Sequence, residues 1–401
     1  MNKSECSMRN HKFRLYPSEE QEKKLLWTLD RCRFTYNKLL EGMNKQEKIN
    51  KNALQHSLVD IKKQYPELQN VHSKTLQYEN WRLFSNLHGL SQLKKNGKKV
   101  GRLRFKSYGS FKTFVYNQTG FKFTKTGNRF DILKLSKIGE LKMRIGEGQN
   151  IPTTEIKQIV IKRHGSGKWF AILCSDELNS ILEPTGKQIG IDVGLSNFIT
   201  DSDGLQIENP KFYKKTLARI RKEQRSLSRK KKGSMNRLKQ KAKLARFHGR
   251  IENQRDDFLH KISRYYVNNY DVICYEKLSI RNMVRNHNLA QGIMDASWGK
   301  FINMVVCKAD SAGRQEIAVD PRGTTQNCAN CGNAVYKGLA DRQHECSCGF
   351  VVHRDYNSAI NILRQGLSEV TPLENRPLHE LERVPASQFV ELGSPHALAV
   401  G

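Results

Sequence analysis

The most constraining feature of this sequence is a group of four cysteines that falls into two closely spaced pairs. Two residues separate Cys328 from Cys331, and after fourteen further residues a single residue separates Cys346 from Cys348. A glycine follows each pair, as in a zinc knuckle, and two knuckles place four thiolates tetrahedrally around one Zn²⁺. Because four sulfur ligands leave no open coordination position, the spacing predicts a structural zinc ribbon.

Two other interpretations of these cysteines stay open from the sequence alone. They could be free or redox-active thiols, or His344 or His353 could replace one sulfur ligand. A disulfide framework would spread cysteines more evenly over a shorter chain. The remaining five cysteines are therefore interpreted as small core residues: Cys6, Cys32, Cys174, Cys274 and Cys307.

The net charge constrains the partner. The 401 residues include 69 lysines and arginines against 39 acidic residues, a formal charge of +30. Such an excess predicts a polyanionic partner, with nucleic acid favoured over a ribosome-like structural role or a membrane surface. No stretch approaches ~18 uninterrupted apolar residues, and residues 1–14 lack the apolar core of a signal peptide. We therefore expect a cytoplasmic protein, associated with the nucleoid in a prokaryote.

Much of this charge lies in one segment, residues 211–250. It holds 17 lysines and arginines and a single acid, Glu223. We expect two helices here, divided near Gly233, and a further helix over 251–268. Phosphate contacts explain the charge better than a solvated helical hairpin does, and they would make binding steeply salt-dependent. Such contacts give affinity and register without reading sequence. The candidate contact residues are Arg219, Arg225, Arg229 and Lys232.

The first part of the chain predicts helices placed between β elements. Residues 9–16 alternate like a strand, and Ser18 is expected to cap a helix that runs to about residue 43. More helix is expected over 52–95, broken near Pro66, and a basic loop over 94–101. Short runs typical of strands then predict a small β-barrel or sandwich, at 111–116, 121–123, 156–162 and 169–174.

A second unit is expected after a boundary at residues 184–186. Three short strands predict a β-meander, and further strands and helices follow it. Beyond residue 368 the chain has four prolines and weak periodicity, so we expect that tail to be disordered or loosely packed. The expected elements are strands at 188–192, 197–200, 205–208, 271–276 and 316–319, and helices at 297–312 and 356–364.

Three acidic residues fall on separate elements of this second unit. Asp192 lies on the first strand, Glu276 ends an apolar strand, and Asp355 begins the last helix. A carboxylate on a buried strand is costly unless it binds metal or is paired, although a cap or a solvated face could explain each acid singly. The element order is that of an RNase H-like fold, in which these elements converge. Three carboxylates there can hold two Mg²⁺ ions, one activating water and one stabilising the leaving 3′ oxygen of a phosphodiester.

Short motifs recur along nearly the whole chain and are densest from 187 to 364. They are Leu15-Tyr-Pro17, Glu20-Gln21, Tyr36-Asn37, Gly190-Ile-Asp-Val-Gly194, Asn253-Gln-Arg-Asp-Asp257 with His260-Lys261, Tyr275-Glu-Lys-Leu278, Asp295-Ala-Ser-Trp298, Val319-Asp-Pro-Arg322, Thr324-Thr-Gln326 and Arg354-Asp-Tyr-Asn-Ser-Ala359. Together they resemble the TnpB proteins, transposon-encoded relatives of type V CRISPR effectors. Tyr356 and Thr325 depart from the usual residues of that family, but neither replaces a carboxylate.

The resemblance implies a RuvC-like nuclease guided by a transposon-end (omega) RNA, which cuts both strands of matching DNA beside a short adjacent motif. Asp192, Glu276 and Asp355 fall on the family's catalytic acids, which hold two Mg²⁺ (or Mn²⁺) ions, and the four cysteines fall on its zinc-finger insertion. The expected partners of a monomeric chain are one guide RNA and double-stranded target DNA. The implied domains are a wedge strand (1–16), a helical recognition lobe (17–99), a wedge β-barrel (100–183), a RuvC-like nuclease (187–323), a zinc ribbon (324–350), the last nuclease helix (351–367) and a flexible C-terminal tail (368–401).

Candidate contacts with nucleic acid in the first part of the chain are Lys74 and Gln77 on the recognition helix and Tyr116 and Gln118 on the barrel. Ordinary surface or packing roles are the alternative for all four. Other functions also remain open: a transposon accessory or transposase-type DNA-binding protein, a non-cutting RNA-guided repressor or RNA chaperone, and an effector guided by a CRISPR array. The acid order Asp, Glu, Asp argues against an Asp-Asp-Glu transposase, and the intact acids argue against a non-cutting protein.

Overall fold

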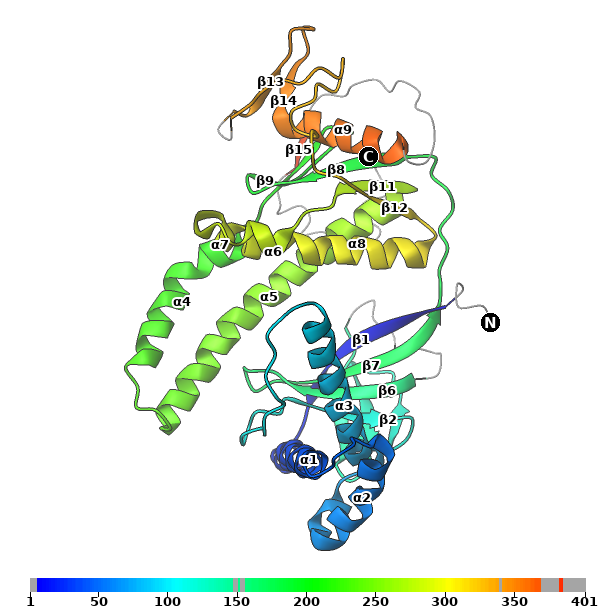
Figure 1. The fold of residues 1–401 in the computed structure, drawn as a ribbon, viewed down its shortest axis with the longest axis vertical. Helices are drawn as coiled ribbons and strands as arrows, with labels where there is room; N and C mark the ends of the chain where they lie inside the picture. Colours follow the sequence, from blue (N-terminus) through cyan, green and yellow to red (C-terminus); the bar gives the residue numbers. More distant parts are fainter. Residues whose placement is uncertain (1–5, 147–150, 152–155, 339–340, 369–381, 385–401) are drawn as a thin grey trace. The chain divides into compact units, whose positions relative to one another are not determined.

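The computed structural model describes residues 6–146, 151, 156–338, 341–368 and 382–384. The chain divides into two compact units, Met1–Leu178 and Asn179–Gly401, and each combines helices with a β-sheet (Figure 1). The predicted mixed α/β class is therefore confirmed. Among the described residues, no helix combines the length and the apolar character that crossing a membrane would require.

The first unit is built on a seven-stranded antiparallel sheet. Strand β1 (Cys6–Tyr16) lies inside it, hydrogen-bonded to β7 on one side and β5 on the other. Its inward side chains Phe13 and Leu15 are fully buried. Strands β4 and β5 were not predicted, although exposed lysines and arginines alternate with their buried leucines as in other half-buried strands. The sheet order is β2 (Thr113–Asn117), β6 (Ile156–Arg163), β7 (Trp169–Leu178), β1, β5 (Gly139–Arg144), β4 (Phe130–Leu135), β3 (Phe121–Thr124).

Helices of the first unit follow β1, as the sequence predicts. Helix α1 (Glu19–Asn44) begins with a capping box, in which the Ser18 hydroxyl accepts from the Gln21 N–H and the Gln21 side chain accepts from the Ser18 N–H. Helix α2 (Lys51–Gln64) ends before a 3₁₀ turn (Pro66–Asn70), and helix α3 (Ser73–Lys95) follows. The predicted break near Pro66 is confirmed, since proline lacks the N–H that a continuing helix needs.

The second unit contains a six-stranded sheet with a mixed topology. Strands β8 (Gln188–Val193), β9 (Asn197–Asp201) and β10 (Leu205–Glu208) form the predicted antiparallel meander. Strand β11 (Val272–Glu276) pairs parallel to β8, and β12 (Gln315–Val319) pairs parallel to β11. Strand β15 (Glu382–Val384) pairs parallel to β10, within the tail that was expected to be disordered or loosely packed. Its remaining residues, 369–381 and 385–401, lie outside the described ones.

Helix α9 (Arg354–Ser368) covers one face of this sheet and packs on β8, β11 and β12. The packing is closest at Gly190, where an added Cβ would lie 2.2 Å from the carbonyl oxygen of Ala359. The opposite face is covered by α5 and by α8 (Trp298–Ala312), which form a separate apolar core with Ile189, Ile191 and Ile273. Residues of β8 therefore alternate between the two faces, with Gly190 and Asp192 on the α9 side.

A long helical hairpin extends from the second unit (Figure 1). Helix α4 (Phe212–Ser228) and helix α5 (Met235–Asn269) are joined by the turn that contains Gly233. Residues 251–268 are helical, as predicted, but they continue α5 and do not form a separate helix, since Gly249 just before them does not interrupt it. Asp295, at the end of α7 (His287–Ala296), accepts from the backbone N–H of Tyr213 and from Arg255 Nη2 at 2.9 Å, which anchors both helices. Helix α7 and the short α6 (Ile280–Met283) were not predicted.

Candidate metal centres and nucleic-acid surfaces

The structure brings the three predicted acids to one edge of the six-stranded sheet. Tyr275 pairs with Ile191 in parallel register, so Asp192 and Glu276 follow side by side at the carboxyl ends of β8 and β11. Alternation along both strands points these two side chains to the face covered by α9. Asp355 lies in the first turn of that helix, so three elements that are distant in sequence converge there.

The negative charges of these three carboxylates repel one another in a site that is shielded from water. Burial raises the pKa of Asp192 well above its ordinary value, and the nearby charges of Glu276 and Asp355 raise it further. Burial also raises the pKa of Glu276. A hydrogen bond of 2.5 Å donated by Thr324 Oγ1 lowers this pKa and offsets part of the rise. Arg354 offsets part of the repulsion, with Nε 3.3 Å from Asp355 Oδ1. A bound cation would relieve the remaining repulsion, so the residues fit a divalent metal ion.

The four cysteines converge more tightly than the acids. Among the described residues, they are the one group of three or more His, Cys, Asp or Glu whose candidate ligand atoms all lie within 4.8 Å of one another. The Sγ atoms of Cys328 and Cys348 are 3.7 Å apart, and those of Cys331 and Cys346 are 3.5 Å apart. A tetrahedral zinc with Zn–S bonds of about 2.3 Å separates its sulfurs by about 3.8 Å. The thiols therefore fit one metal ion without an open position.

Two tight turns create this geometry. Gly332 and Gly349 have φ angles of 79° and 85°, which residues with a side chain rarely adopt. Their N–H groups donate to the carbonyls of Cys328 at 2.8 Å and Cys346 at 2.9 Å. The second turn joins β13 (Gln343–Glu345) to β14 (Val351–His353). Neither His344 nor His353 belongs to the ligand set, so the interpretation of a histidine ligand is not supported.

Side-chain amides on α9 connect the cysteine turns to the helix that carries Asp355. Asn357 Oδ1 accepts from the Ala329 N–H at 2.9 Å, and Asn357 Nδ2 donates to the Asn327 carbonyl at 2.8 Å. Asn361 Nδ2 donates to the carbonyls of Asn327 at 2.7 Å and Thr324 at 2.9 Å. Neither asparagine was predicted as a functional residue from the sequence. The available signal was the motif at 354–359, which contains Asn357.

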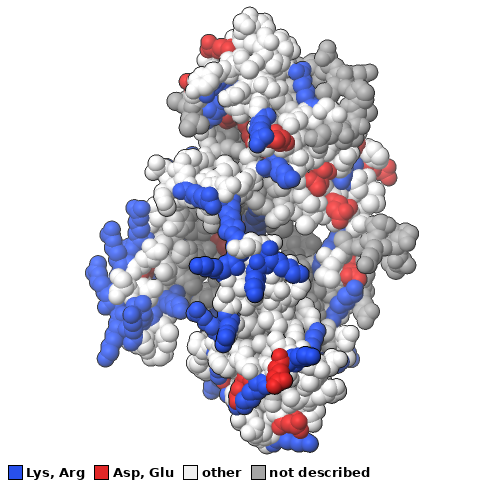
Figure 2. Space-filling model, viewed as in Figure 1, with Lys and Arg blue, Asp and Glu red and all other residues white. Residues whose placement is uncertain are grey.

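The four candidate contacts on the basic hairpin are all exposed, and none has an ion pair with a described residue: Arg219, Arg225, Arg229 and Lys232. Glu223, the single acid of residues 211–250, is neutralised within the hairpin, because this residue of α4 lies 2.9 Å from Lys243 Nζ on α5. Figure 2 shows lysines and arginines crowding the hairpin at the left of the view. The exposed charge of residues 211–250 is therefore positive and suits a polyanion.

The candidates of the first unit separate into two groups. Lys74 and Gln77 line a cavity of 540 Å³ together with Trp81, whose side chain is 51% exposed. Tyr116 is a wrong prediction as a surface contact: it is 1% exposed, and its hydroxyl donates to the Ser136 carbonyl at 2.6 Å. Gln118 is exposed in the turn after β2 but does not line this cavity. Trp81 was missed, because a single tryptophan on a polar helix face carries no distinctive spacing.

Known proteins are similar to this chain over most of its length. Family models match residues 172–287 ("Probable transposase"), 298–362 ("Cas12f1-like, TNB domain") and 8–51 ("Helix-turn-helix domain"). Residues 8–51 here form β1 and α1 rather than two helices joined by a turn. A solved Cas12f1–sgRNA–target DNA complex contains a chain with a TM-score of 0.57 and 15% identity, covering 89% of this chain and 98% of that one, which shows a shared fold.

Curated relatives extend over most of the chain. A Streptomyces pristinaespiralis protein named "Putative RNA-guided DNA endonuclease" is 33% identical and covers 90% of both chains. An Escherichia coli protein named "Putative RNA-guided DNA endonuclease InsQ" is 29% identical, covering 88% of this chain and 91% of the relative. The fold and these relatives place the chain in the class of transposon- and CRISPR-associated nucleases. Within that class, the chain belongs to the TnpB family.

Proposed function

We propose that this chain is an RNA-guided DNA endonuclease that binds a transposon-end RNA and cleaves guide-matched double-stranded DNA beside a short adjacent motif. The observation that carries the proposal is the convergence of Asp192, Glu276 and Asp355, with raised pKa values at the first two, in a member of the TnpB family. A group of partly buried acids that repel one another is costly to a fold. Its presence is explained by a reaction that needs metal ions.

The sheet order supports a RuvC-like, RNase H-like nuclease domain in the second unit. An antiparallel meander followed by two strands parallel to its first member places the first and fourth strands side by side. The seven-stranded sheet and helices of the first unit correspond in this proposal to the wedge and the recognition lobe, with the domain bounds expected from the sequence. The cysteine turns correspond to a zinc ribbon inserted between β12 and α9.

Three carboxylates would hold two Mg²⁺ ions, which supply Lewis-acid activation for phosphodiester hydrolysis. The oxygen atoms of these acids are not gathered as closely as the sulfur atoms of the cysteines. This spacing suits a wider two-ion site better than one enclosed ion. Thr324 orients Glu276 through its 2.5 Å hydrogen bond. Asn357 and Asn361 hold the base of α9 against the loop before the ribbon, so they position Asp355 without touching the reacting atoms.

The remaining surfaces take the nucleic acid. The exposed cations of α4 and α5 would contact phosphates of the guide RNA or of its duplex with DNA. The cavity lined by Lys74 and Gln77 combines amides, two lysines and the exposed Trp81, which suits the edges of base pairs in the adjacent motif. Sequence in the target itself is read by pairing with the guide.

The test uses the chain purified with its co-expressed RNA, a matching DNA target beside a randomised flank, and Mg²⁺. Cleavage beside a defined flank is expected. Asp192→Asn should abolish it and keep RNA binding, whereas Asp310→Asn, at an exposed acid of α8, should cleave like the wild type. No cleavage with any flank would reject the nuclease, and strand joining in place of cleavage would favour a transposase. Loss of RNA binding in Asp192→Asn would make that acid structural.

A separate measurement tests the ribbon. Metal analysis of the purified chain should find about one zinc per chain, and Cys328→Ser should lose it. Because the Cys328 turn is linked to α9 through Ala329 and Asn357, removing zinc should also slow cleavage without removing the RNA. A folded, active chain that contains no zinc would overturn the zinc assignment.

A further inference from the structure

The segment between α3 and β2 is an irregular loop with an unusual composition. Residues 102–112 contain the cations Arg102, Arg104, Lys106 and Lys112 and no acid. Two aromatic rings stand out from it, with Phe105 58% exposed and Tyr108 84% exposed. Exposed aromatic rings among cations are typical of surfaces that bind single-stranded nucleic acid, since each ring can stack on a base while the cations attract phosphates.

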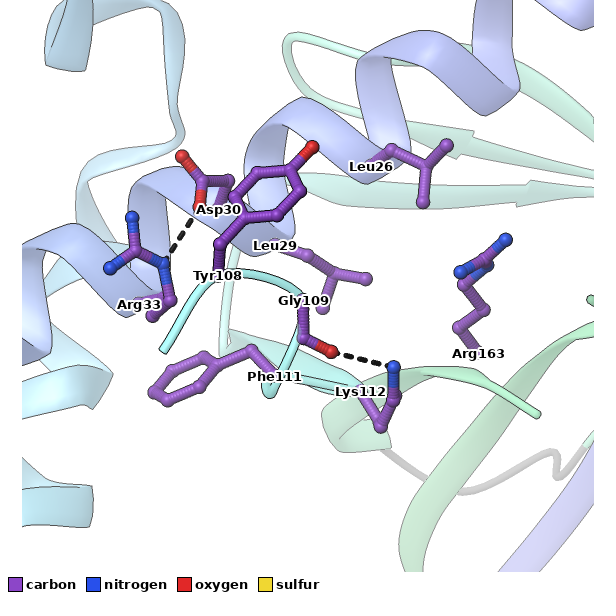
Figure 3. Close-up of a pocket in the computed structure, with 9 residues that line it drawn as sticks. All are labelled: Leu26, Leu29, Asp30, Arg33, Tyr108, Gly109, Phe111, Lys112 and Arg163. Carbon is purple, nitrogen blue, oxygen red and sulfur yellow. Dashed lines mark hydrogen bonds and ion pairs between the residues drawn. The ribbon is translucent and has the colours of Figure 1, made fainter. Parts of the chain in front are cut away.

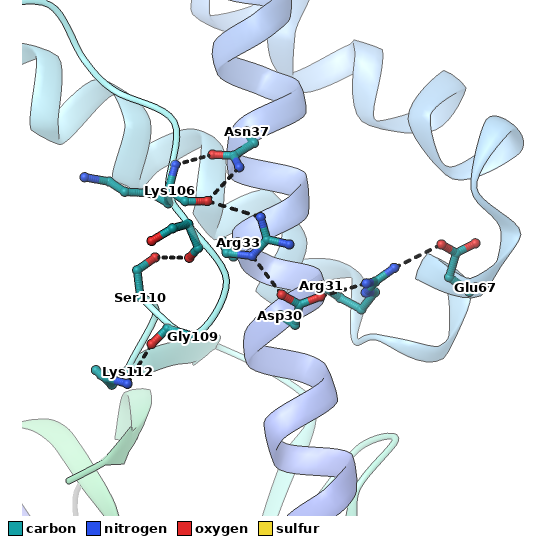
Figure 4. A network of polar contacts seen from close by, with 10 residues as sticks. Asp30, Arg31, Arg33, Asn37, Glu67, Lys106, Gly109, Ser110 and Lys112 are labelled. Atoms are coloured by element: carbon teal, nitrogen blue, oxygen red, sulfur yellow. Dashed lines mark hydrogen bonds and ion pairs between the residues drawn. The ribbon is translucent and has the colours of Figure 1, made fainter. Parts of the chain in front are cut away.

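The loop is held in place despite having no regular structure. Asn37 on α1 makes two hydrogen bonds to Lys106: its Nδ2 donates to the carbonyl at 3.0 Å, and its Oδ1 accepts from the N–H at 2.8 Å. Arg33 Nη1 donates to the same carbonyl at 3.1 Å (Figure 4). Side-chain bonds to backbone groups reduce the conformational entropy that a ligand would otherwise have to remove. The loop is therefore preorganised.

A cavity of 210 Å³ lies between this loop, α1 and the end of β6 (Figure 3). Leu26, Leu29 and Phe111 line its apolar part, and the exposed ring of Tyr108 lies at its edge. The volume is below the roughly 300–1,000 Å³ of sites for drug-sized molecules. It suits one planar ring system rather than a larger ligand.

The free charge of this cavity is positive. Arg163 lines it, its guanidinium makes no hydrogen bond or ion pair with a described residue, and its Nε is buried without a partner. The only acid that lines the cavity, Asp30, is occupied by two arginines, Arg31 and Arg33, each 2.7 Å away. The Arg163 guanidinium lies 6.0 Å from the centre of the Trp169 ring, and an anionic group beside the ring of a ligand would supply the ion pair that it lacks among the described residues.

We infer that this cavity binds one unpaired nucleotide of the guide RNA. Its base stacks on Tyr108 above the floor formed by Leu26 and Leu29, and its phosphate pairs with Arg163. This inference rests on the proposed function, since it assumes a bound guide. Guide RNA is favoured over target DNA because RNA loops and ends present unstacked bases, whereas a base of duplex DNA must first be unpaired at a cost of a few kcal/mol.

The first experiment identifies the occupant. The chain is purified with its co-expressed RNA, bound to target DNA, irradiated with ultraviolet light and digested, and nucleotide adducts on peptides are identified by mass. A ribonucleotide adduct on the peptide that contains Tyr108 is expected. A deoxyribonucleotide adduct there, or adducts on other peptides but none on this one, would overturn the inference and leave the proposed function standing.

The second experiment measures affinity for the same RNA. Tyr108→Ala should weaken binding about 5- to 150-fold, the effect of losing one base stack, while Tyr108→Phe should bind like the wild type. Arg163→Gln should weaken binding and reduce the slope of log affinity against log salt by about 0.7. Tyr336→Ala removes an equally exposed ring, 90% exposed, outside the cavity and serves as the control.

The outcomes separate the two proposals. Wild-type affinity in Tyr108→Ala, or a loss equal to that of Tyr336→Ala, would refute the cavity as a nucleotide site while RNA-guided cleavage persists. A wild-type chain that carries no RNA would refute both. Because Tyr108 is exposed, its variants should keep the wild-type melting temperature, which is measured alongside.

Discussion

Gly190 offers a direct test of how the sheet positions the acids, because it lies where α9 passes closest to β8. An alanine Cβ there would lie 2.2 Å from the Ala359 carbonyl oxygen and 2.7 Å from the Leu363 N. Both are backbone atoms, so no side-chain rotation can relieve the overlap. Restoring an ordinary contact of about 3.5 Å requires α9 to retreat by about 1 Å.

A shift of α9 affects both stability and cleavage, because this helix carries Asp355. Overpacking of this kind costs roughly 1–3 kcal/mol of stability or more, so the melting temperature of Gly190→Ala should fall. Asp355 moves with α9, and a displacement of about 1 Å at a catalytic group can cost about 100-fold in rate. We therefore expect Gly190→Ala to retain its RNA and to cleave the target about 100-fold more slowly.

The assay compares single-turnover cleavage and thermal melting of the two chains with the same guide. Gly299→Ala is the matched control: its Cβ would meet the nearest atom, Ile280 Cγ1, at an ordinary 3.8 Å, and alanine is the better helix former. It should cleave normally and melt no lower than the wild type. A Gly190→Ala chain with wild-type cleavage and melting would show that this close approach does not position Asp355.

Three further predictions concern separate parts of the chain. Thr324→Val should lower kcat/KM about 10- to 100-fold by removing the hydrogen bond to the Glu276 carboxylate, and Thr324→Ser should restore it. Burial raises the pKa of Glu79 to about 8, so only the folded chain holds that proton above about pH 4.5. Stability should then fall by up to about 4 kcal/mol as pH rises from 5 to 8, and Glu79→Gln should flatten that dependence in thermal melts. Replacing Arg219 and Arg225 by glutamine should weaken binding of all nucleic-acid sequences alike and reduce the salt slope by about 0.7–0.9 per lost phosphate contact.

Local structure was largely predictable from the sequence, since its causes lie within a few residues. The helix after Ser18 begins with the expected N-cap, and the break near Pro66 appears as a 3₁₀ turn. The meander and both parallel strands fall close to their predicted bounds. The cysteine turns were predictable for the same reason, because each knuckle is a turn of a few residues closed by a glycine.

Predictions were wrong where distant contacts decide the outcome. Tyr116 was predicted as a surface contact, but the strand that carries it turns its side chain into the core. There its hydroxyl donates to the Ser136 carbonyl. Helix α5 continues through residues 251–268, where its buried face packs on α8. Residues 382–384 form a strand because β10 offers a parallel partner. None of these partners can be identified from a local pattern.

The sequence by itself determined which chemical groups this protein has: three acids in the order Asp192, Glu276, Asp355, and four cysteines in two pairs. Only the tertiary structure decided that they meet. The acids share one face because residue alternation on two parallel strands turns them toward α9, and α9 reaches them because Gly190 has no side chain. The cavity beside Tyr108 likewise brings together residues as distant in the sequence as Leu26 and Arg163. Such proximity depends on packing between distant segments, which the order of residues alone does not specify.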